Sequence, residues 1–464
     1  MSSLLPRDTA RPRLRRNALL STLSLALLAL AAGPARADAP TGRHAFPTTY
    51  DAEGNRLPRP EWDLSVRGYG QLLFAWYDYD LDQTRAGGAR EASRLVFDTT
   101  RFTMEIEGAL PFGLEFEAEV ELEHHGAGAA VELEYDEFGE YEQEVEAGGE
   151  VVLEELFLAK SFGPLRLRLG RFYLGVGLLS ELYRPTEYLA AARPESEQIV
   201  IPGVWDELGV EATLRLESVL LTLQVVNGLD STGFSSATWI SGGHQQRFEL
   251  VSASDLAVVL RADWTPTPGL TVGASAYYGG TTRNRPKADL LPDCDDPGDT
   301  EVAPCGVVSA DVLLVDGHVT VDLPPFTARA VALWGHLANA GAVSDRNARL
   351  SNNLAVPRTP IADEAFFAWL ELGVDLAPTL GMDPGHHLEP FVRLEYYDTM
   401  FDVRDGVFDN PRFARAVSSV GVGWAYGDLV YAKLDWTHRE VGAFEDGTDL
   451  RAEDGVRLGV GFTY

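Results

Sequence analysis

Long apolar runs, cysteine and lysine are all scarce in this 464-residue chain. Beyond residue 37, no stretch approaches the run of about 18 apolar residues that marks a membrane-spanning helix, so helical spans are excluded. The chain has two cysteines and no Cys-x-x-Cys motif, which leaves little basis for a redox or zinc site. It has 38 basic residues against 70 acidic ones, and only three of the basic residues are lysines. The resulting net charge of −32 disfavours nucleic-acid binding, which requires cations that neutralise phosphates.

Catalytic and metal-binding motifs are also missing. The sequence contains no Gly-x-Ser-x-Gly, no His-Glu-x-x-His and no phosphate-loop pattern. The pairs His124-His125 and His386-His387 are adjacent in sequence, and adjacent side chains on a strand point to opposite faces. They therefore do not converge on a metal ion. We expect no enzymatic activity, no cofactor and no metal.

The first 37 residues have the composition of an export signal. A basic region is followed by the apolar residues 18–32 and by the small-x-small sequence Ala35-Arg36-Ala37. We predict that residues 1–37 are a cleaved signal peptide and that residues 38–64 form a short periplasmic segment. Residues 1–37 carry six arginines and one aspartate, so the rest of the chain would have a net charge near −37. In an exported chain, Cys294 and Cys305, which share one acidic loop, are expected to form a disulfide.

From residue 65 to residue 464, apolar and polar residues alternate in about sixteen runs. The final run has Val456, Leu458, Val460, Phe462 and Tyr464 on one face and Arg457, Gly459, Gly461 and Thr463 on the other. Long connections are expected near residues 81–92, 126–149, 175–206, 228–254, 280–308, 338–361, 399–415 and 441–453. Short ones are expected near residues 111–113, 163–164, 217–218, 266–269, 324–325, 378–386 and 427.

This regular alternation of short and long connections is typical of outer-membrane barrels. The sequence predicts an all-β fold: a transmembrane antiparallel β-barrel of about 16 strands with short periplasmic turns and long extracellular loops. The expected location is the bacterial outer membrane, in contact with outer-membrane lipid and lipopolysaccharide. A secreted β-sandwich or propeller is the alternative, but its loops would not alternate so regularly in length.

One predicted strand carries a row of glutamates that must face water. Glu115, Glu117, Glu119, Glu121 and Glu123 alternate with apolar residues, and charges facing lipid would each cost several kcal/mol. In a barrel that water is the lumen, so the interior is expected to be polar and open; a solvated edge of an ordinary sheet is the alternative. Arg166 and Arg168 alternate with leucines, and a bulge at Gly170 could keep Arg171 inward. The candidate pore-lining residues are Arg101, Glu105, Glu115, Glu117, Glu119, Glu121, Arg166, Arg168 and Arg171. The arginines could also be ion-pair partners of the glutamates.

A long connection after the fifth strand is predicted to narrow the pore. Sixteen-stranded barrels are wide enough for an aqueous channel, and a loop of about residues 175–206 folding inward would restrict it. Its candidate constriction residues are Glu181, Arg184, Glu187, Arg193, Glu195 and Glu197.

Two stretches resemble the phosphate-selective porin O and P family: EELFLAKSFGPLRLRLGRF at residues 154–172 and IVIPGVWDELGVEA at residues 199–212, with RPE from Arg193 between them. The resemblance implies a 16-stranded barrel with an inward third loop, and it implies a homotrimer. It also implies an arginine-lined phosphate pathway, to which Arg166, Arg168 and Arg171 correspond by position.

The expected function is passive diffusion of small hydrophilic solutes or inorganic ions. A row of carboxylates would raise the local cation concentration, so a weak cation preference is expected. An anion- or phosphate-selective channel using the three arginines is one alternative. An outer-membrane barrel enzyme, a lipase or protease, is another; it would need Ser, His and a carboxylate converging on the outer rim.

Overall fold

The computed structural model describes residues 63–79, 92–124, 131–134, 142–145, 151–245, 251–284, 309–348, 359–443 and 452–464. The predicted signal peptide, residues 38–62 and the predicted Cys294–Cys305 disulfide lie outside these ranges. The strands are β1 (Asp63–Tyr79), β2 (Ala92–Leu110), β3 (Leu114–Glu123), β4 (Val131–Glu134), β5 (Glu142–Val145), β6 (Val151–Phe162), β7 (Leu165–Tyr173), β8 (Asp206–Leu216), β9 (Val219–Asn227), β10 (Leu256–Thr267), β11 (Leu270–Gly280), β12 (Asp311–Leu323), β13 (Phe326–Leu337), β14 (Glu364–Val374), β15 (His386–Asp402), β16 (Ala414–Tyr426), β17 (Val430–Val441) and β18 (Glu453–Thr463). The helices are α2 (Glu195–Val200), α3 (Ala340–Asn347) and the short 3-10 turns η1 (Pro111–Gly113), η3 (Ser231–Gly233), η4 (Ser241–Gly243) and η6 (Pro411–Phe413).

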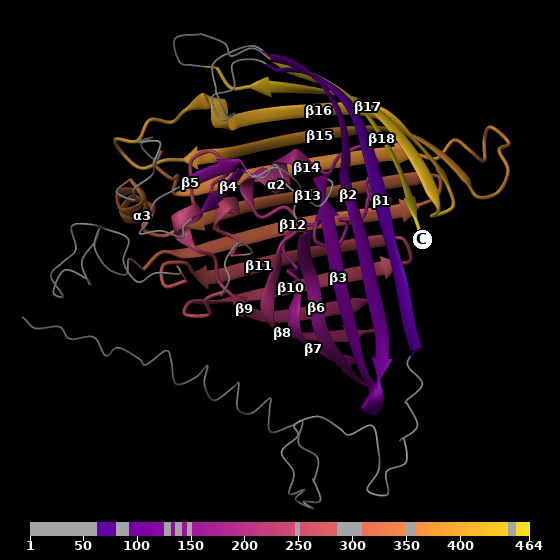
Figure 1. Cartoon of the computed structure of the whole chain (residues 1–464), viewed down its shortest axis with the longest axis horizontal. Coiled ribbons are helices and arrows are strands. Elements are labelled where there is room, and N and C mark those ends of the chain that lie inside the picture. Colours follow the sequence, from indigo (N-terminus) through magenta and orange to yellow (C-terminus); the bar gives the residue numbers. More distant parts are fainter. Residues whose placement is uncertain are drawn as a thin grey trace, which may run out of the picture. The chain divides into compact units, whose positions relative to one another are not determined.

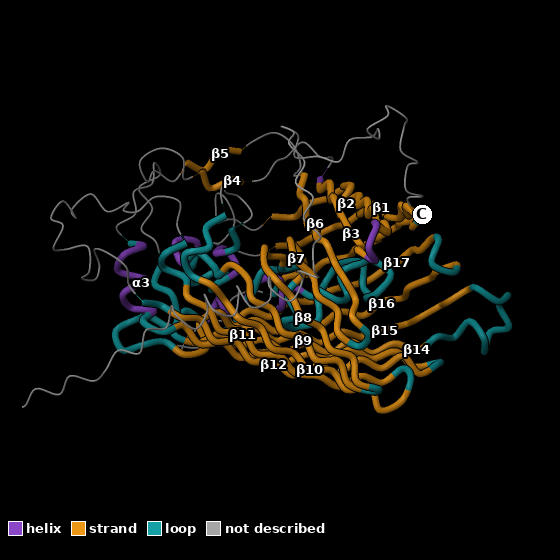
Figure 2. The backbone as a smooth tube through the Cα atoms, turned by 90° about the horizontal axis from the view of Figure 1, so that it is seen from below, coloured by secondary structure: helices purple, strands orange, loops and turns teal. Residues whose placement is uncertain are grey.

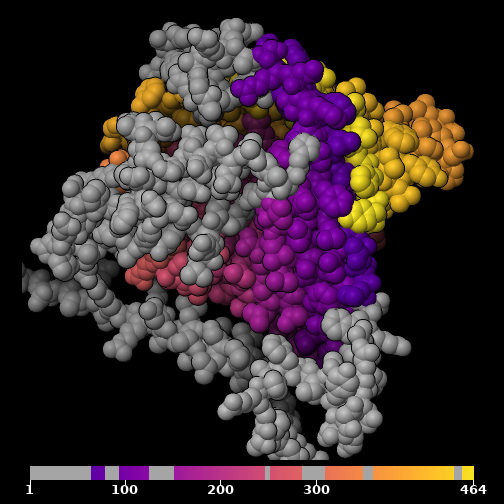
Figure 3. Space-filling view, viewed as in Figure 1, coloured from indigo at the N-terminus to yellow at the C-terminus, as the bar shows by residue number. Residues whose placement is uncertain are grey.

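Sixteen of these strands form one closed antiparallel barrel (Figure 1). Each barrel strand pairs with its neighbour along the chain, and β1 closes the ring by pairing with β18 from Tyr69↔Thr463 to Asp78↔Asp454. Figure 3 shows this junction, where the yellow C-terminal residues lie against the indigo strand β1. Strands β4 and β5 form a separate hairpin. The predicted fold class is confirmed, and the seven short connections fall where the sequence places them.

The outer face of the barrel is apolar because every second side chain points outward. On β18, Val456, Leu458 and Phe462 are exposed, as predicted from their alternation. Exposed tryptophans lie on β1, β10 and β17, at Trp76, Trp264 and Trp436. None of the helices in the described residues is long and apolar enough to cross a membrane.

The interior differs from the open, polar lumen that the sequence predicted. Wall residues such as Phe172 and Phe367 pack with residues from long connections, including Trp205, Trp239 and Ile240, in one buried apolar cluster. Two of these cluster residues from different connections are also joined by a hydrogen bond: Trp239 donates from Nε1 to the Ala362 backbone oxygen at 3.2 Å. A period of two separates the faces of a strand, but it does not reveal that apolar loops fill part of the inside. Figure 2 shows these connections at the ends of the strands.

Candidate functional site

The connection from β7 to β8, residues 174–205, is called the inward loop here. Its two ends lie side by side, since Leu174 N donates to the Trp205 oxygen at 2.7 Å. Between them, the loop hydrogen-bonds to side chains of widely separated strands, namely Gln71 of β1, Asp316 of β12, Glu371 of β14, Glu395 of β15 and Asp435 of β17. A single segment reaches that many strands of a closed ring only from inside it. Helix α2 belongs to this loop and packs against β14 and β15 (Figure 1).

Glu197, on α2, holds the start of the inward loop. Its carboxylate accepts hydrogen bonds from Leu178 N at 2.8 Å, from Leu179 N at 2.9 Å and from Trp369 Nε1 at 2.8 Å. Burial raises the pKa of Glu197 to about 7, and these hydrogen bonds oppose the rise. The side chain therefore anchors the loop and does not project into a channel.

The other predicted constriction residues also contact the wall or the loop itself. Arg184 forms a bidentate pair with Glu105 of β2, at 2.8 and 3.1 Å, and Glu187 accepts from Arg184 N at 3.0 Å. Arg193 donates from Nε and Nη2 to the backbone carbonyl oxygen of Tyr183, at 3.0 and 2.8 Å. These contacts hold the middle of the loop in one path.

Two loop carboxylates reach arginines on distant strands. Glu181, whose side chain is 53% exposed, lies 3.1 Å from Arg261 Nη2 of β10. Glu195 pairs with Arg439 of β17 and accepts from Tyr397 of β15. Burial opposes ionisation of Glu195, but the arginine outweighs it and the pKa lies below its usual value.

The predicted glutamate row lies on β3. Together with Glu105 of β2 and Glu154 of β6, its members form a surface that is called the acidic wall here. Glu105, Glu119 and Glu121 are buried, Glu117 is half-buried and Glu115 is exposed at the end of the row. Glu105 also belongs to a group with Glu107 and Glu117 whose carboxylate oxygens lie within 4.8 Å of one another. Arg67 pairs with Glu105 and Glu107, so a guanidinium already supplies positive charge there.

Three tyrosines that the sequence analysis did not single out donate to this wall. Tyr69 donates to Glu121 at 3.2 Å and Tyr183 to Glu119 at 3.2 Å. Tyr173 donates to Glu154 at 2.9 Å. Tyr69 lies on the same face of β1 as the polar residues Arg67 and Gln71, so its inward position could be predicted from the period of two. The inward position of Glu154 could not be predicted in this way, because Glu154 is next to Glu155 and interrupts the alternation.

The predicted pore-lining arginines are paired with carboxylates. Arg101 lies 3.6 Å from Glu121, and Arg166 lies 3.1 Å from Glu115. Arg168 donates from Nε to Glu211 at 2.8 Å, and its Nη1 lies 3.7 Å from Glu155. Arg171 pairs with Asp206 at the start of β8. The neighbouring strands show no bulge at Gly170, where Arg171 stands opposite Leu156 and Leu208. The bulge expected there is therefore wrong.

Two polar cavities flank the inward loop. The turn-side cavity, of about 740 Å³, adjoins the Gly163-Pro164 turn. Its charged lining is Glu155, Arg166, Arg168, Glu181, Glu211, Arg215, Glu217 and Arg261. The loop-side cavity, of about 360 Å³, is bordered by Gly242 and His244 from the β9–β10 connection. Its other charged lining is Glu121, Glu123, Glu154 and Arg193. Tyr173 and Tyr183 line the first cavity and donate toward carboxylates near the second.

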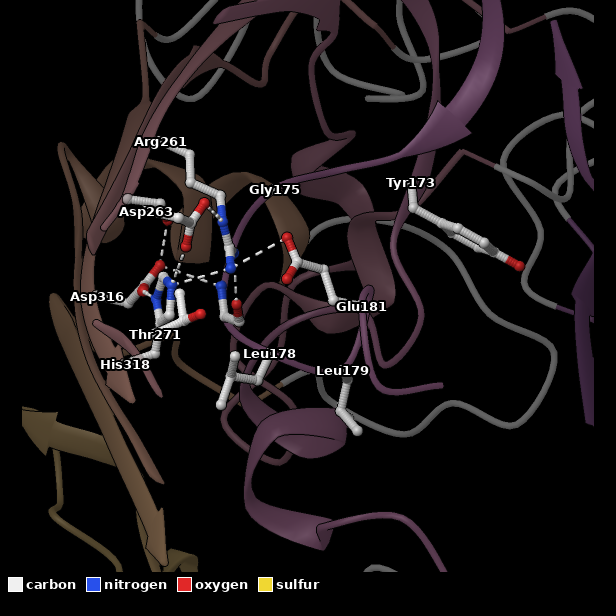
Figure 4. A network of polar contacts seen from close by, with 12 residues as sticks. Tyr173, Gly175, Leu178, Leu179, Glu181, Arg261, Asp263, Thr271, Asp316 and His318 are labelled. Carbon is white, nitrogen blue, oxygen red and sulfur yellow. Dashed lines mark hydrogen bonds and ion pairs between the residues drawn. The ribbon is translucent and has the colours of Figure 1, made fainter. Parts of the chain in front are cut away.

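A buried polar network anchors the loop to β10 and β12 (Figure 4). Arg261 donates to Asp263 at 2.8 Å and to the Gly177 oxygen at 2.9 Å. His318 lies between Asp316 and Asp263, each 2.8 Å from a ring nitrogen. The hydroxyl of Ser275 donates to Asp316 and not to His318. Since both ring nitrogens of His318 face carboxylates, this cluster lacks the serine–histidine pair of a hydrolase.

Comparison with known proteins gives distant similarities. No family model matches the chain, so membership of the phosphate-selective porin O and P family stays a prediction. An uncharacterised protein of Aquifex aeolicus is 27% identical over 220 residues, which cover 47% of this chain and 44% of that relative. The match thus spans less than half of the relative's length.

Solved outer-membrane proteins are similar in architecture at low identity. A loop-deletion mutant of OmpT from Vibrio cholerae gives a TM-score of 0.48 at 7% identity, covering 87% of this chain and 100% of that one. The outer-membrane channel DcaP of Acinetobacter baumannii gives 0.46 at 12%, covering 87% and 97%. An anion-selective porin from Comamonas acidovorans gives 0.44 at 10%, covering 87% and 100%.

Proposed function

We propose that this protein is an outer-membrane porin, a passive diffusion pore for small hydrophilic solutes or inorganic ions with a weak preference for cations. The observation that carries the proposal is the acidic wall inside a closed barrel, with polar cavities on both sides of the inward loop. The apolar outer face would contact outer-membrane lipid and lipopolysaccharide, and the assembly would be a homotrimer.

The charge balance along the acidic wall supports a cation preference. The five wall carboxylates, those of Glu105, Glu117, Glu119, Glu121 and Glu154, outnumber the arginines paired with them in the described residues, which are Arg67, Arg101 and Arg184. An excess of carboxylates in a confined, partly dehydrated space raises the concentration of cations and repels anions. Solutes would pass beside this wall, through the polar cavities that adjoin the inward loop.

A planar-bilayer recording under a salt gradient tests the proposal. We expect a reversal potential that indicates weak to moderate cation preference. Glu117→Gln, at a half-buried wall position, should reduce that preference. Glu440→Gln should leave it unchanged, because the Glu440 side chain is 72% exposed on β17 and lies 3.9 Å from His438, away from the acidic wall. The absence of channels, or a reversal potential unaffected by Glu117→Gln, would refute the proposal.

Anion selectivity is the second candidate, favoured by the arginines that line the turn-side cavity. Arg166, Arg168 and Arg261 all border it, although each is paired with a carboxylate. In the same recording, a clear anion preference that Arg168→Ala abolishes would favour this candidate. For the barrel-enzyme alternative, lipase and protease assays on the purified protein are expected to show no hydrolysis.

A further inference from the structure

Glu119 is a fully buried carboxylate with an incomplete set of partners. Its relative exposure is 0%, and its Oε2 accepts from the Tyr183 hydroxyl at 3.2 Å. Its Oε1 is buried and has no hydrogen-bond partner among the described residues. A buried carboxylate oxygen without a donor is costly unless a cation or a proton neutralises it.

A β-bulge places a second buried carboxylate next to Glu119 in the pairing of β3 with β6. In the pairing of β3 with β6, Glu119 stands opposite Glu155 and Val120 opposite Leu153, so Glu154 is the extra residue. A bulge re-aims side chains, and here the consecutive residues Glu154 and Glu155 are both buried. The two carboxylates are linked through their tyrosines: Tyr173 donates to Glu154 and Tyr183 to Glu119, and the centroids of the two rings lie 4.8 Å apart.

These two carboxylates differ from their neighbours in their partners. Glu105 pairs with Arg184, Glu121 with Arg101 and Glu155 with Arg168. In the described part of the chain, Glu119 and Glu154 receive only tyrosine hydroxyls, from Tyr183 and Tyr173.

Around Glu119 and Glu154, the carboxylates outnumber the arginines by two. This zone comprises the charged lining of the loop-side cavity, with Arg193 as its arginine, together with Glu119 beside Glu154 and Arg101, which pairs with Glu121. Arg193 donates from Nε and Nη2 to the backbone carbonyl oxygen of Tyr183. With every group ionised, the zone carries two net negative charges. The four carboxylates are those of Glu119, Glu121, Glu123 and Glu154.

We propose that Glu119 and Glu154 bind a divalent cation, and that calcium fits best. Calcium takes oxygen ligands in a flexible geometry and tolerates water or carbonyl oxygens beside carboxylates. Glu154 lines the loop-side cavity of about 360 Å³, which gives the ion a route to the pair. Cation binding at this site does not require ion conduction through the barrel, so its test is independent of the test of the porin proposal.

Terbium luminescence of the full-length protein in detergent micelles tests the site. Tb³⁺ occupies calcium sites, and Tyr173 and Tyr183 are close enough to both carboxylates to sensitise its emission. We expect tyrosine-excited emission that calcium displaces. Glu119→Gln and Glu154→Gln should each weaken calcium binding about tenfold or more, because each removes a charged ligand. Glu440→Gln, on the exposed face of β17, should bind as the wild type does.

Two controls keep the test decisive. Far-UV circular dichroism identifies variants that do not fold. Tyr173→Phe keeps both carboxylates but should lower the sensitised emission, while calorimetry should still detect calcium. The proposal is overturned if calcium displaces no sensitised terbium in the wild type. It is equally overturned if Glu119→Gln binds as the wild type does, since Glu119 then carries a proton and no metal.

Discussion

Glu197 is a single side chain that fixes the path of the inward loop, residues 174–205. Three donors from two distant segments converge on its carboxylate: Leu178 N, Leu179 N and Trp369 Nε1. Because the group is buried, ionising it costs more in the folded protein than in the unfolded chain. Its pKa of about 7, against an ordinary value of 4.5, expresses that cost.

The shift predicts a pH dependence of stability. A carboxyl whose pKa is raised on folding binds more protons in the folded state, so stability falls as the pH rises from 4.5 to about 7. The wild-type protein should be more stable at about pH 5 than at about pH 8, by up to about 3 kcal/mol. Denaturant unfolding in micelles, followed by tryptophan fluorescence at both pH values, measures the difference.

Glu197→Gln should reduce the stability difference between the two pH values by the contribution of Glu197, up to about 3 kcal/mol. It should also cost about 1–3 kcal/mol, because the amide can present an N–H to Trp369 Nε1 in place of an acceptor. Glu440→Gln, at an exposed position, should preserve the wild-type profile. An unchanged pH profile in Glu197→Gln would show that another group is responsible.

The inward loop, as an element, depends on close backbone approaches at its start. Gly177 has a φ of +71°, and a Cβ there would lie 2.1 Å from Glu197 Oε1. Gly163, in the β6–β7 turn, has a φ of +61° but nothing within 4 Å of an added Cβ. The two glycines share the left-handed conformation and differ only in their surroundings.

Gly177→Ala and Gly163→Ala therefore form a matched pair. Both should incur the left-handed penalty of about 1–2 kcal/mol, but only Gly177→Ala should displace Glu197 and loosen the loop. Limited proteolysis of the folded protein should cut within residues 178–203 only in Gly177→Ala. Equal proteolysis of the two variants would mean that the Glu197 anchor does not hold the loop.

At the scale of the whole molecule, the barrel closes through strand pairing alone. Every strand of the ring has two neighbours, and the last pairs with the first. The inward loop adds side-chain contacts to many strands but no strand to the ring. Since Leu174 N bonds to the Trp205 oxygen at 2.7 Å, the ring closes equally well over a much shorter connection.

Replacing residues 177–203 with a short Gly-Ser linker should thus leave a folded barrel with a wider passage. The strand content, measured by far-UV circular dichroism, should be retained, and single-channel conductance should rise. Replacing the exposed turn residues 378–381 with the same linker should leave conductance at the wild-type value. An unfolded product would show that the loop is required for barrel formation.

Local sequence predicted some features of the candidate site and not others. The glutamates of β3 were predicted to face inward because five in succession alternate with apolar residues, and the buried ones do. Glu154 and Tyr173 were missed, because a bulge and a strand end interrupt the alternation by which faces are assigned. The partners of Arg166 and Arg168 come from neighbouring strands, and pairing register is not encoded in any single strand.

The sequence by itself determined that this protein is a closed ring of sixteen strands with short turns at one end. Alternation with a period of two, and the spacing of turns, are local properties that each strand carries alone. Only the tertiary structure decided what occupies the inside: an apolar cluster, a loop that crosses the interior, and the carboxylates of Glu119 and Glu154, to which tyrosine hydroxyls donate. Those outcomes depend on contacts across the barrel between side chains that are far apart in the sequence, and a local sequence pattern does not encode such contacts.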